Sequence, residues 1–378
     1  METSYSNKPY FFVPLLDSAN RRKAPSRQDI LSADTKTGKF DITIKCETPL
    51  HFGSGQLLFD ESTKRFTHSL IRENGRIALP GSSFKGMLRS VFESITESCV
   101  VLSANPSIYA DDKAHIKQLK EDIKSKIGGL QRCDKKSKYL CPACSVFGHL
   151  SHKGKLTISS FYSDTEPVIL RIPQLEQPFK TYPRPARGER DNRTGNERLY
   201  YGKFSEKRGL DVAKMSKADF LTLKKREPQS GGNFYGRKFY KHSGNWKTLA
   251  DSSGRGNYEC LPAGAILKGW ITYQGLTEDE LGGLLFALGL GLGWEKPIYH
   301  KLGYAKPAFF GSAKLTVQPE PLLRYEDKPM STADAENKAT KYYEKHKSAI
   351  GAAVNAIEHE WTEIGNSMWT MNEGRYGY

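Results

Sequence analysis

The order of residue patterns along the chain predicts an α+β fold made of two β-α-β units. Alternation of apolar and polar residues predicts four strands, at 39–46, 154–162, 265–273 and 312–317. Helically spaced apolar residues predict one helix between each pair of strands, at 84–95 and 281–288. This order suits a ferredoxin-like sheet with helices on one face. The other face of such a sheet is open, and RRM-type domains bind RNA there.

The composition indicates a basic protein without membrane spans. Lysine and arginine total 57 against 42 aspartate and glutamate, a formal net charge of +15. Such an excess points to a polyanionic partner, most often nucleic acid, although a merely solvated basic surface has the same total. No run of about 18 apolar residues occurs, and the first residues lack a signal-peptide pattern. We therefore expect a cytoplasmic protein with no membrane contact.

The first strand follows a polar N-terminal extension, residues 1–38, and is followed by a turn-rich stretch, 48–55. A polar loop is expected from Gln56 to about Asn74. The helix at 84–95 comes next, and Ser82 or Ser83 is its expected N-cap.

The start of that helix has the groups that a phosphate needs. Free backbone N–H groups, Ser82, Ser83 and Lys85 would lie together, with Arg89 one turn further on. The alternative is an ordinary capped helix whose cations are only solvated.

Three cysteines in a polar, lysine-rich loop have metal-ligand spacing. Cys141 and Cys144 form a Cys-x-x-Cys pair and Cys133 lies eight residues upstream, within a loop region 99–152 that interrupts the first half of the core, 39–162. Two thiolates at this spacing can bind one tetrahedral ion, so we expect structural Zn²⁺. Redox chemistry and free thiols are the alternatives. The fourth ligand stays open among four residues, with His115 as the working choice: Cys99, His115, His149 and His152.

The middle of the chain, 163–260, is predicted to be a long basic insertion. Residues 181–260 contain 18 lysines and arginines and 9 acidic residues, which is +9 of the total +15. Aromatic residues are interleaved with these charges. Cations for phosphates and rings for bases suit single-stranded nucleic acid. The alternative is a poorly packed insertion whose charge serves solubility.

The second half of the core, 261–318, contains the capping box Thr277-Glu-Asp-Glu280 and then a glycine-rich run. The run includes His300, Lys301 and Lys306. In the tail, 319–378, residues rich in alanine, lysine and glutamate predict a helix from about Thr332 to Trp361.

Four motifs in order resemble one family, the repeat-associated mysterious protein (RAMP) superfamily of CRISPR systems. Leu79-Pro-Gly-Ser-Ser-Phe-Lys-Gly-Met-Leu-Arg89 is similar to its Pro-Gly-Ser-Ser helix start, and Thr48-Pro-Leu-His-Phe-Gly-Ser-Gly55 to the loop after its first strand. Cys141-Pro-Ala-Cys-Ser-Val-Phe-Gly148 resembles its Cys-x-x-Cys element. His300-Lys-Leu-Gly-Tyr-Ala-Lys-Pro-Ala-Phe-Phe-Gly-Ser312 resembles its C-terminal glycine-rich loop.

The resemblance implies a CRISPR RNA-binding backbone subunit of a type III effector, a ribonucleoprotein complex of several RAMP subunits that acts on target RNA in antiviral defence. It implies a zinc loop, and a thumb-like hairpin that the 163–260 insertion could supply. The run Gly236-Arg-Lys-Phe-Tyr240 suggests a less common branch of the superfamily, and we add its two cations to the RNA contacts. The expected RNA-binding residues are then Ser82, Ser83, Lys85, Arg89, Arg237, Lys238, His300, Lys301 and Lys306.

The resemblance also implies a catalytic aspartate in the loop between the first strand and the first helix. Asp60 is the one aspartate there, with Glu61 beside it and His68 as a second participant. Such a carboxylate could bind Mg²⁺ and cut target RNA as an endoribonuclease. Two alternatives stay open: a non-catalytic scaffold or capping subunit, and a metal-independent nuclease that processes CRISPR repeats with a cluster such as Tyr299, His300 and Lys301.

Overall fold

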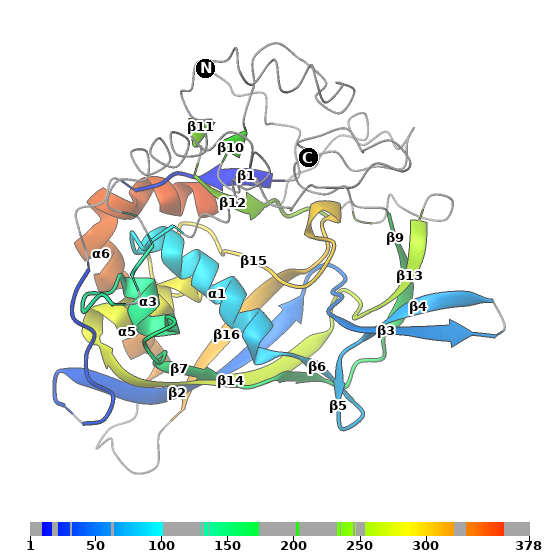
Figure 1. The fold of residues 1–378 in the computed structure, drawn as a ribbon, viewed down its shortest axis with the longest axis horizontal. Coiled ribbons are helices and arrows are strands. Elements are labelled where there is room, and N and C mark those ends of the chain that lie inside the picture. Colours follow the sequence, from blue (N-terminus) through cyan, green and yellow to red (C-terminus); the bar gives the residue numbers. More distant parts are fainter. Residues whose placement is uncertain are drawn as a thin grey trace.

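The computed structural model describes most of the chain outside the middle insertion and the two ends (Figure 1). The described residues are 10–16, 22–30, 32–61, 64–100, 130, 132–134, 136–173, 202–203, 233–234, 236–244, 246, 254–320 and 330–358. Within this part, no helix is both long and apolar enough to cross a membrane.

The protein is a mixed α/β structure centred on one large antiparallel sheet. Its strands run in the order β15 (His300–Lys301), β16 (Ser312–Glu320), β2 (Thr35–Cys46), β14 (Ile266–Thr277), β8 (Phe161–Ser163), β6 (Arg76–Leu79) and β5 (Arg72–Glu73). The short strand β7 (Leu156–Ile158) also pairs with β14. The four predicted strands are confirmed, and the second of them is divided into β7 and β8.

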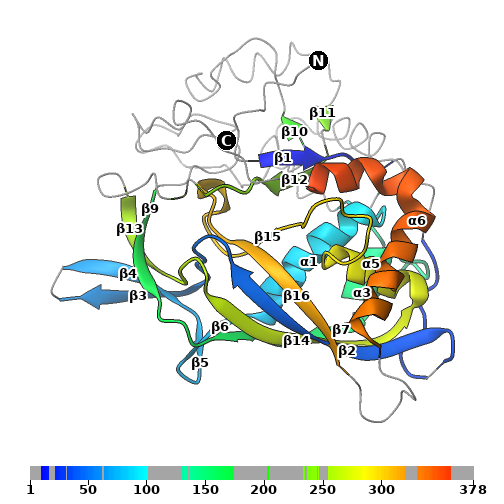
Figure 2. The same ribbon diagram turned by 180° about the vertical axis from the view of Figure 1, so that it is seen from behind.

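Helices cover one face of this sheet (Figure 1). They are α1 (Gly81–Ile95), α3 (Pro142–Phe147), α5 (Glu278–Ala287) and α6 (Thr332–Ile357). Along β2, Phe40, Ile42 and Ile44 are buried, whereas the residues between them are only partly buried. The period-two alternation therefore marks the face that packs against the helices. Seen from behind, β16, β2 and β14 cross in front of α1 (Figure 2).

The predicted apolar stripe of the first helix is confirmed. Phe84, Leu88 and Phe92 are fully buried, and the Phe84 ring stacks on Phe161 of β8 with centroids 4.5 Å apart. Burial of each such side chain contributes about 1.5–3 kcal/mol. The predicted capping box of α5 is confirmed as well: Glu280 N–H donates to Thr277 Oγ1, and Thr277 N–H donates to Glu280 Oε2.

A serine N-cap for α1 was predicted, and that prediction is wrong. The helix begins at Gly81, its N-cap is Pro80 in an extended conformation, and both serines lie inside the first turn. Glycine at position 81 lets the helix begin in close contact with the sheet, because a Cβ there would come within 2.3 Å of the Ile158 carbonyl oxygen. The backbone of α1 thus begins directly against the sheet, and the serine hydroxyls stay free for other partners.

The predicted polar loop at 56–74 is also wrong, because most of it is a β-hairpin. β3 (Gly53–Asp60) and β4 (Arg65–Leu70) pair with each other, and β4 continues into a second sheet with β13 (Gly254–Cys260) and β9 (Val168–Pro173). In Figure 1 this hairpin projects away from the helices. The sequences of its two arms, GSGQLLFD and RFTHSL, have no apolar–polar alternation that would mark them as strands.

A buried ion pair connects three distant parts of the chain. Lys155 Nζ donates to Glu280 Oε2 of α5 and to Ser26 Oγ, each at 2.6 Å. Ser145 of α3 donates to the other carboxylate oxygen of Glu280, also at 2.6 Å. The Lys155 side chain is fully buried, so this pair is held in a low-dielectric environment where its partners must be satisfied.

Candidate functional site

Four buried cysteines converge behind the C-terminal end of α1. The sulfur atoms of Cys99, Cys133, Cys141 and Cys144 all lie within 4.8 Å of one another. Cys141 is the N-cap of α3 and Cys144 lies in its first turn, which places both thiols of the Cys-x-x-Cys pair on one side. Cys99 follows α1 directly, so a helix end and a helix start supply three of the four groups.

This donor set fits a tetrahedral metal ion such as Zn²⁺. Two sulfurs bound to one zinc at about 2.3 Å lie roughly 3.8 Å apart, and the Cys99 and Cys144 sulfurs are separated by 3.7 Å. The backbone N–H of Cys141 donates to Cys133 Sγ at 3.3 Å. Hydrogen bonds among the four thiols lower the pKa of Cys141 and raise the pKa of Cys99 and Cys144, so the thiols share their protons unevenly.

The two described histidines considered as the fourth ligand, His149 and His152, are not among the clustered groups. His115 lies outside the described residues. His149 Nε2 is 2.9 Å from the carbonyl oxygen of Cys133 and so supports the loop from outside the cluster. Among the described residues the fourth thiol comes from Cys99. In the sequence only its residue type marked it as a ligand, because it lies 34 positions before Cys133 and belongs to no spaced motif.

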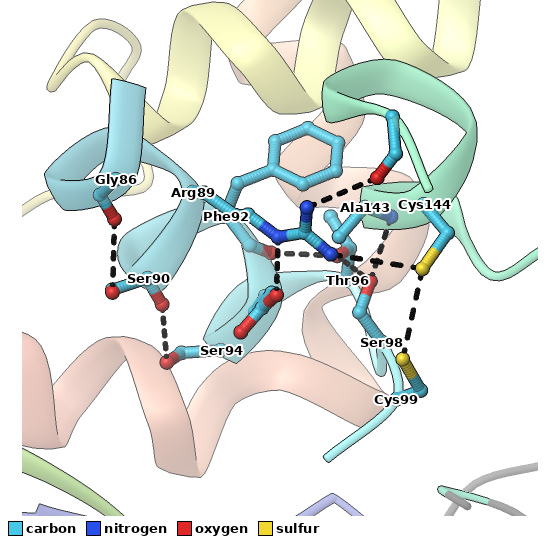
Figure 3. A network of polar contacts seen from close by, with 12 residues as sticks. Gly86, Arg89, Ser90, Phe92, Ser94, Thr96, Ser98, Cys99, Ala143 and Cys144 are labelled. Atoms are coloured by element: carbon cyan, nitrogen blue, oxygen red, sulfur yellow. Dashed lines mark hydrogen bonds and ion pairs between the residues drawn. The ribbon is translucent and has the colours of Figure 1, made fainter. Parts of the chain in front are cut away.

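Two predicted RNA-binding arginines contact residues of this cysteine cluster, Arg237 with its side chain 8% exposed and Arg89 with its side chain 28% exposed. Arg89 donates to Cys144 Sγ at 3.6 Å, to the Gly148 carbonyl at 3.0 Å and to Glu93 at 2.7 Å (Figure 3). Arg237 donates to the other oxygen of Glu93 at 3.1 Å and to the Ser98 and Cys99 carbonyls. Two guanidinium groups therefore offset the negative charge that four thiolates would place here.

The start of α1 presents an uncapped helix N-terminus to solvent. Ser82 and Ser83 are exposed, no side chain caps the helix, and the first turn has no acidic residue. Lys85 is half-buried, with Nζ 3.4 Å from the Leu156 carbonyl oxygen, and burial followed by Arg89 lowers its pKa. Helix N–H groups, the helix dipole, two hydroxyls and one cation together suit an anion.

The cations of the glycine-rich loop differ in their burial and in their hydrogen bonds. Lys301 Nζ donates to the carbonyls of Phe309 and Phe310 at 3.1 and 3.2 Å, and burial lowers its pKa well below the usual range. His300 is buried, its Nε2 donates to the Ala287 carbonyl at 2.9 Å, and burial lowers its pKa to about 4. Lys306 is half-buried, as Lys301 is, and burial lowers its pKa; its side chain has no hydrogen bond or ion pair within the described part of the chain.

Comparison with known proteins identifies the family. The sequence matches the RAMP superfamily over residues 43–294. The chain belongs to the RAMP superfamily. No curated protein matches the chain. Among solved structures it is similar to one titled "Type IV-B CRISPR Complex", at 19% identity and a TM-score of 0.32, covering 79% of this chain and 98% of the other. At that TM-score the likeness carries no further argument.

The remaining predicted site residues of this RAMP protein lie in the second sheet and near the N-terminus. Asp60 ends β3, opposite Arg65 in the hairpin. Lys238 is buried in β12 (Arg237–Tyr240), with Nζ 4.1 Å from the ring centroid of Tyr10 in β1 (Tyr10–Val13), and burial lowers its pKa to about 7. β12 and β1 pair with each other.

Most of the predicted insertion, 163–260, lies outside the described residues. Its described ends are β9 and β13, which pair antiparallel and join the β3–β4 hairpin. Between them the described fragments include β10 (Gly202–Lys203) and β11 (Asn233–Phe234), a two-stranded pair.

Proposed function

We propose that this RAMP protein is a CRISPR RNA-binding subunit of a multi-subunit effector complex of the type III backbone kind, active in antiviral defence. The observation that carries the proposal is the exposed, uncapped start of α1, which lies inside the region that matches the superfamily. Its serines and Lys85 would hold one guide phosphate, and Lys306 of the glycine-rich loop a second. The cysteine cluster would hold a structural Zn²⁺ that fixes the loop behind α1.

The arrangement of the central strands supports the same proposal. The order β16-β2-β14-β8, with α1 before β7 and β8 and α5 between β14 and β16, is the order expected of a ferredoxin-like, RRM-like core. In that reading the second sheet and the 163–260 segment are additions to the core. Other RAMP subunits and target RNA are the further partners that we propose.

Replacing Ser82, Ser83 and Lys85 together by alanine is expected to weaken binding of single-stranded guide RNA about tenfold to a hundredfold. The loss of one cation should also reduce the salt dependence of the affinity by roughly one phosphate contact. Fluorescence anisotropy across a salt series measures both. The matched control is Lys347→Ala with Ser348→Ala, an exposed lysine and serine on α6. Wild-type protein that binds RNA no better than the triple variant would reject the proposal.

We further propose that the protein cleaves target RNA, with Mg²⁺ bound at Asp60. Asp60→Ala in the assembled complex is expected to abolish metal-dependent cutting of target RNA while guide and target binding stay unchanged. Denaturing gel electrophoresis of labelled target measures the cut, and Asp164→Ala, an acid on another loop, is the control. Unchanged cleavage would leave a scaffold subunit. Repeat processing is disfavoured, because His300 and Lys301 both donate to carbonyls inside the fold.

A further inference from the structure

One face of the second sheet carries a row of rings that the fold leaves accessible. The register places Leu57 and Phe59 of β3, Phe66 and His68 of β4, and Tyr258 of β13 on the same face. We call these five residues, with Tyr304 of the glycine-rich loop, the ring row. None of the six belongs to the predicted RNA contacts, and among them only His68 was predicted as a candidate catalytic residue.

The inner half of the ring row is already a stack. The His68 imidazole lies on the Tyr258 ring with centroids 4.4 Å apart and planes at 13°, and Tyr258 lies on Tyr304 at 5.6 Å and 22°. His51 meets the Tyr258 ring edge-on at 5.1 Å and fixes its position. Parallel planar rings with an open end are the surface on which a further planar group stacks.

The outer half of the ring row is exposed apolar surface. Leu57, Phe59 and Phe66 are 53%, 50% and 57% exposed, and Tyr304 of the inner half is 44% exposed. The Phe59 and Phe66 rings lie with centroids 5.0 Å apart, and each residue is about half exposed. Large apolar side chains grouped in this way on a projecting hairpin mark a binding surface.

We propose that the ring row stacks the bases of a single-stranded RNA, an inference that rests on the proposed RNA-binding function. The proposal rests on the rings and not on charge, because the sequence of the hairpin tip has two acidic residues, Asp60 and Glu61, beside the two cations Lys64 and Arg65. The inner end differs, because Lys306 lies two residues from Tyr304 and could hold a phosphate. Residues two apart on a strand, such as Phe66 and His68, are about 6.6–6.8 Å apart, a spacing that successive bases of an extended strand can match.

A second copy of the chain, or another protein, is the competing occupant of this face. Rings with polar edges argue against it, because imidazole and phenol groups can bond to base edges and tolerate water. Leucine substitution separates the two cases. It keeps apolar surface for a protein contact but removes the flat ring on which a base stacks.

The test compares wild-type protein with the double variant Phe59→Leu and Phe66→Leu. Two ligands of equal length are used, a single-stranded RNA and a ribose-phosphate strand without bases. Wild-type protein is expected to bind the RNA about tenfold or more tightly than the abasic strand, and the variant is expected to lose that difference. Affinity for the abasic strand, which reports phosphate contacts, should be the same in both proteins.

Two controls match the change. Leu58→Ala alters the same strand on its opposite face, and Tyr139→Ala removes an exposed ring of the cysteine loop; both should bind RNA as wild type does. Equal affinity of wild-type protein for the two strands would overturn the ring row and leave the proposed function intact. Binding of neither strand would overturn the proposed function itself. Unchanged RNA binding with altered sedimentation of a Phe59→Ala, Phe66→Ala variant would assign the face to a protein partner.

Discussion

Serine in place of both Cys141 and Cys144 is expected to remove one equivalent of bound zinc and to destabilise the protein by several kcal/mol. All four thiols are buried and meet within 4.8 Å, so no water can replace a lost ligand. Structural zinc contributes about 10–16 kcal/mol in zinc-finger peptides; here the main core supplies part of the stability independently. Elemental analysis measures the zinc, and calorimetry with and without chelator measures the unfolding temperature.

The control for that experiment is Cys46→Ala. Cys46 is a buried thiol in β2, burial raises its pKa to about 12, and it takes no part in the cluster. This variant should keep its zinc and its response to chelator, whatever small stability it loses. Wild-type protein without zinc, or a double variant as stable as wild type, would contradict the metal site. Because Arg89 and Arg237 both contact the cluster, the double variant should also loosen β12.

Methionine at Lys155 is expected to cost about 3–5 kcal/mol of unfolding free energy. Removing one member of a buried ion pair leaves the other charge without compensation. Here Glu280 would keep Ser145 and the Thr277 N–H but lose its cation, and Ser26 would lose its donor. Methionine preserves most of the side-chain volume, so packing contributes little to the change. Urea denaturation followed by circular dichroism measures the difference.

The matched variant adds Glu280→Gln to Lys155→Met. Glutamine can keep the capping-box bond and removes the uncompensated charge, so the double variant should recover part of the loss. Arg76→Met, which breaks the exposed pair with Asp164, should cost less than about 1 kcal/mol. A Lys155→Met variant no less stable than Arg76→Met would show that the buried pair is not what joins α5 to β7.

Local periodicity predicted the core well, because packing imposes it directly. Phe84, Leu88 and Phe92 had to share a face, and the alternation along β2 had to mark one side of the sheet. The predicted N-cap of α1 was wrong because the helix begins where Gly81 packs closely against Ile158. That residue lies 77 positions further along the chain, so local sequence does not reveal the contact. The hairpin was missed because its strands are specified by pairing with β13, almost 200 residues away in sequence.

The candidate site was harder to predict than the core, because a sequence shows which residues are charged but not which groups their side chains contact in the fold. Arg89 and Lys85 are four residues apart in one motif and both are partly buried, yet Arg89 contacts Cys144 whereas Lys85 lies in the first turns of α1, beside exposed serines. Lys155 had no pattern that could mark it, since it stands alone before a short strand. Cys99 could be named as a ligand candidate but not chosen, because its distance in sequence from Cys133 says nothing about the loop between them.

The buried cations have a consequence for how RNA binding depends on salt. Four of them, Lys155, Lys301, Arg89 and Arg237, are engaged with carboxylates, carbonyls or a thiol inside the fold. Counterions are released from RNA only where a protein cation reaches a phosphate. Lys155 and Arg237, whose side chains are 0% and 8% exposed, cannot do so, and the formal charge of +15 therefore overstates the number of ions that binding exchanges. The slope of log affinity against log salt concentration therefore depends only on lysines and arginines at the surface. It measures how many of them contact RNA phosphates.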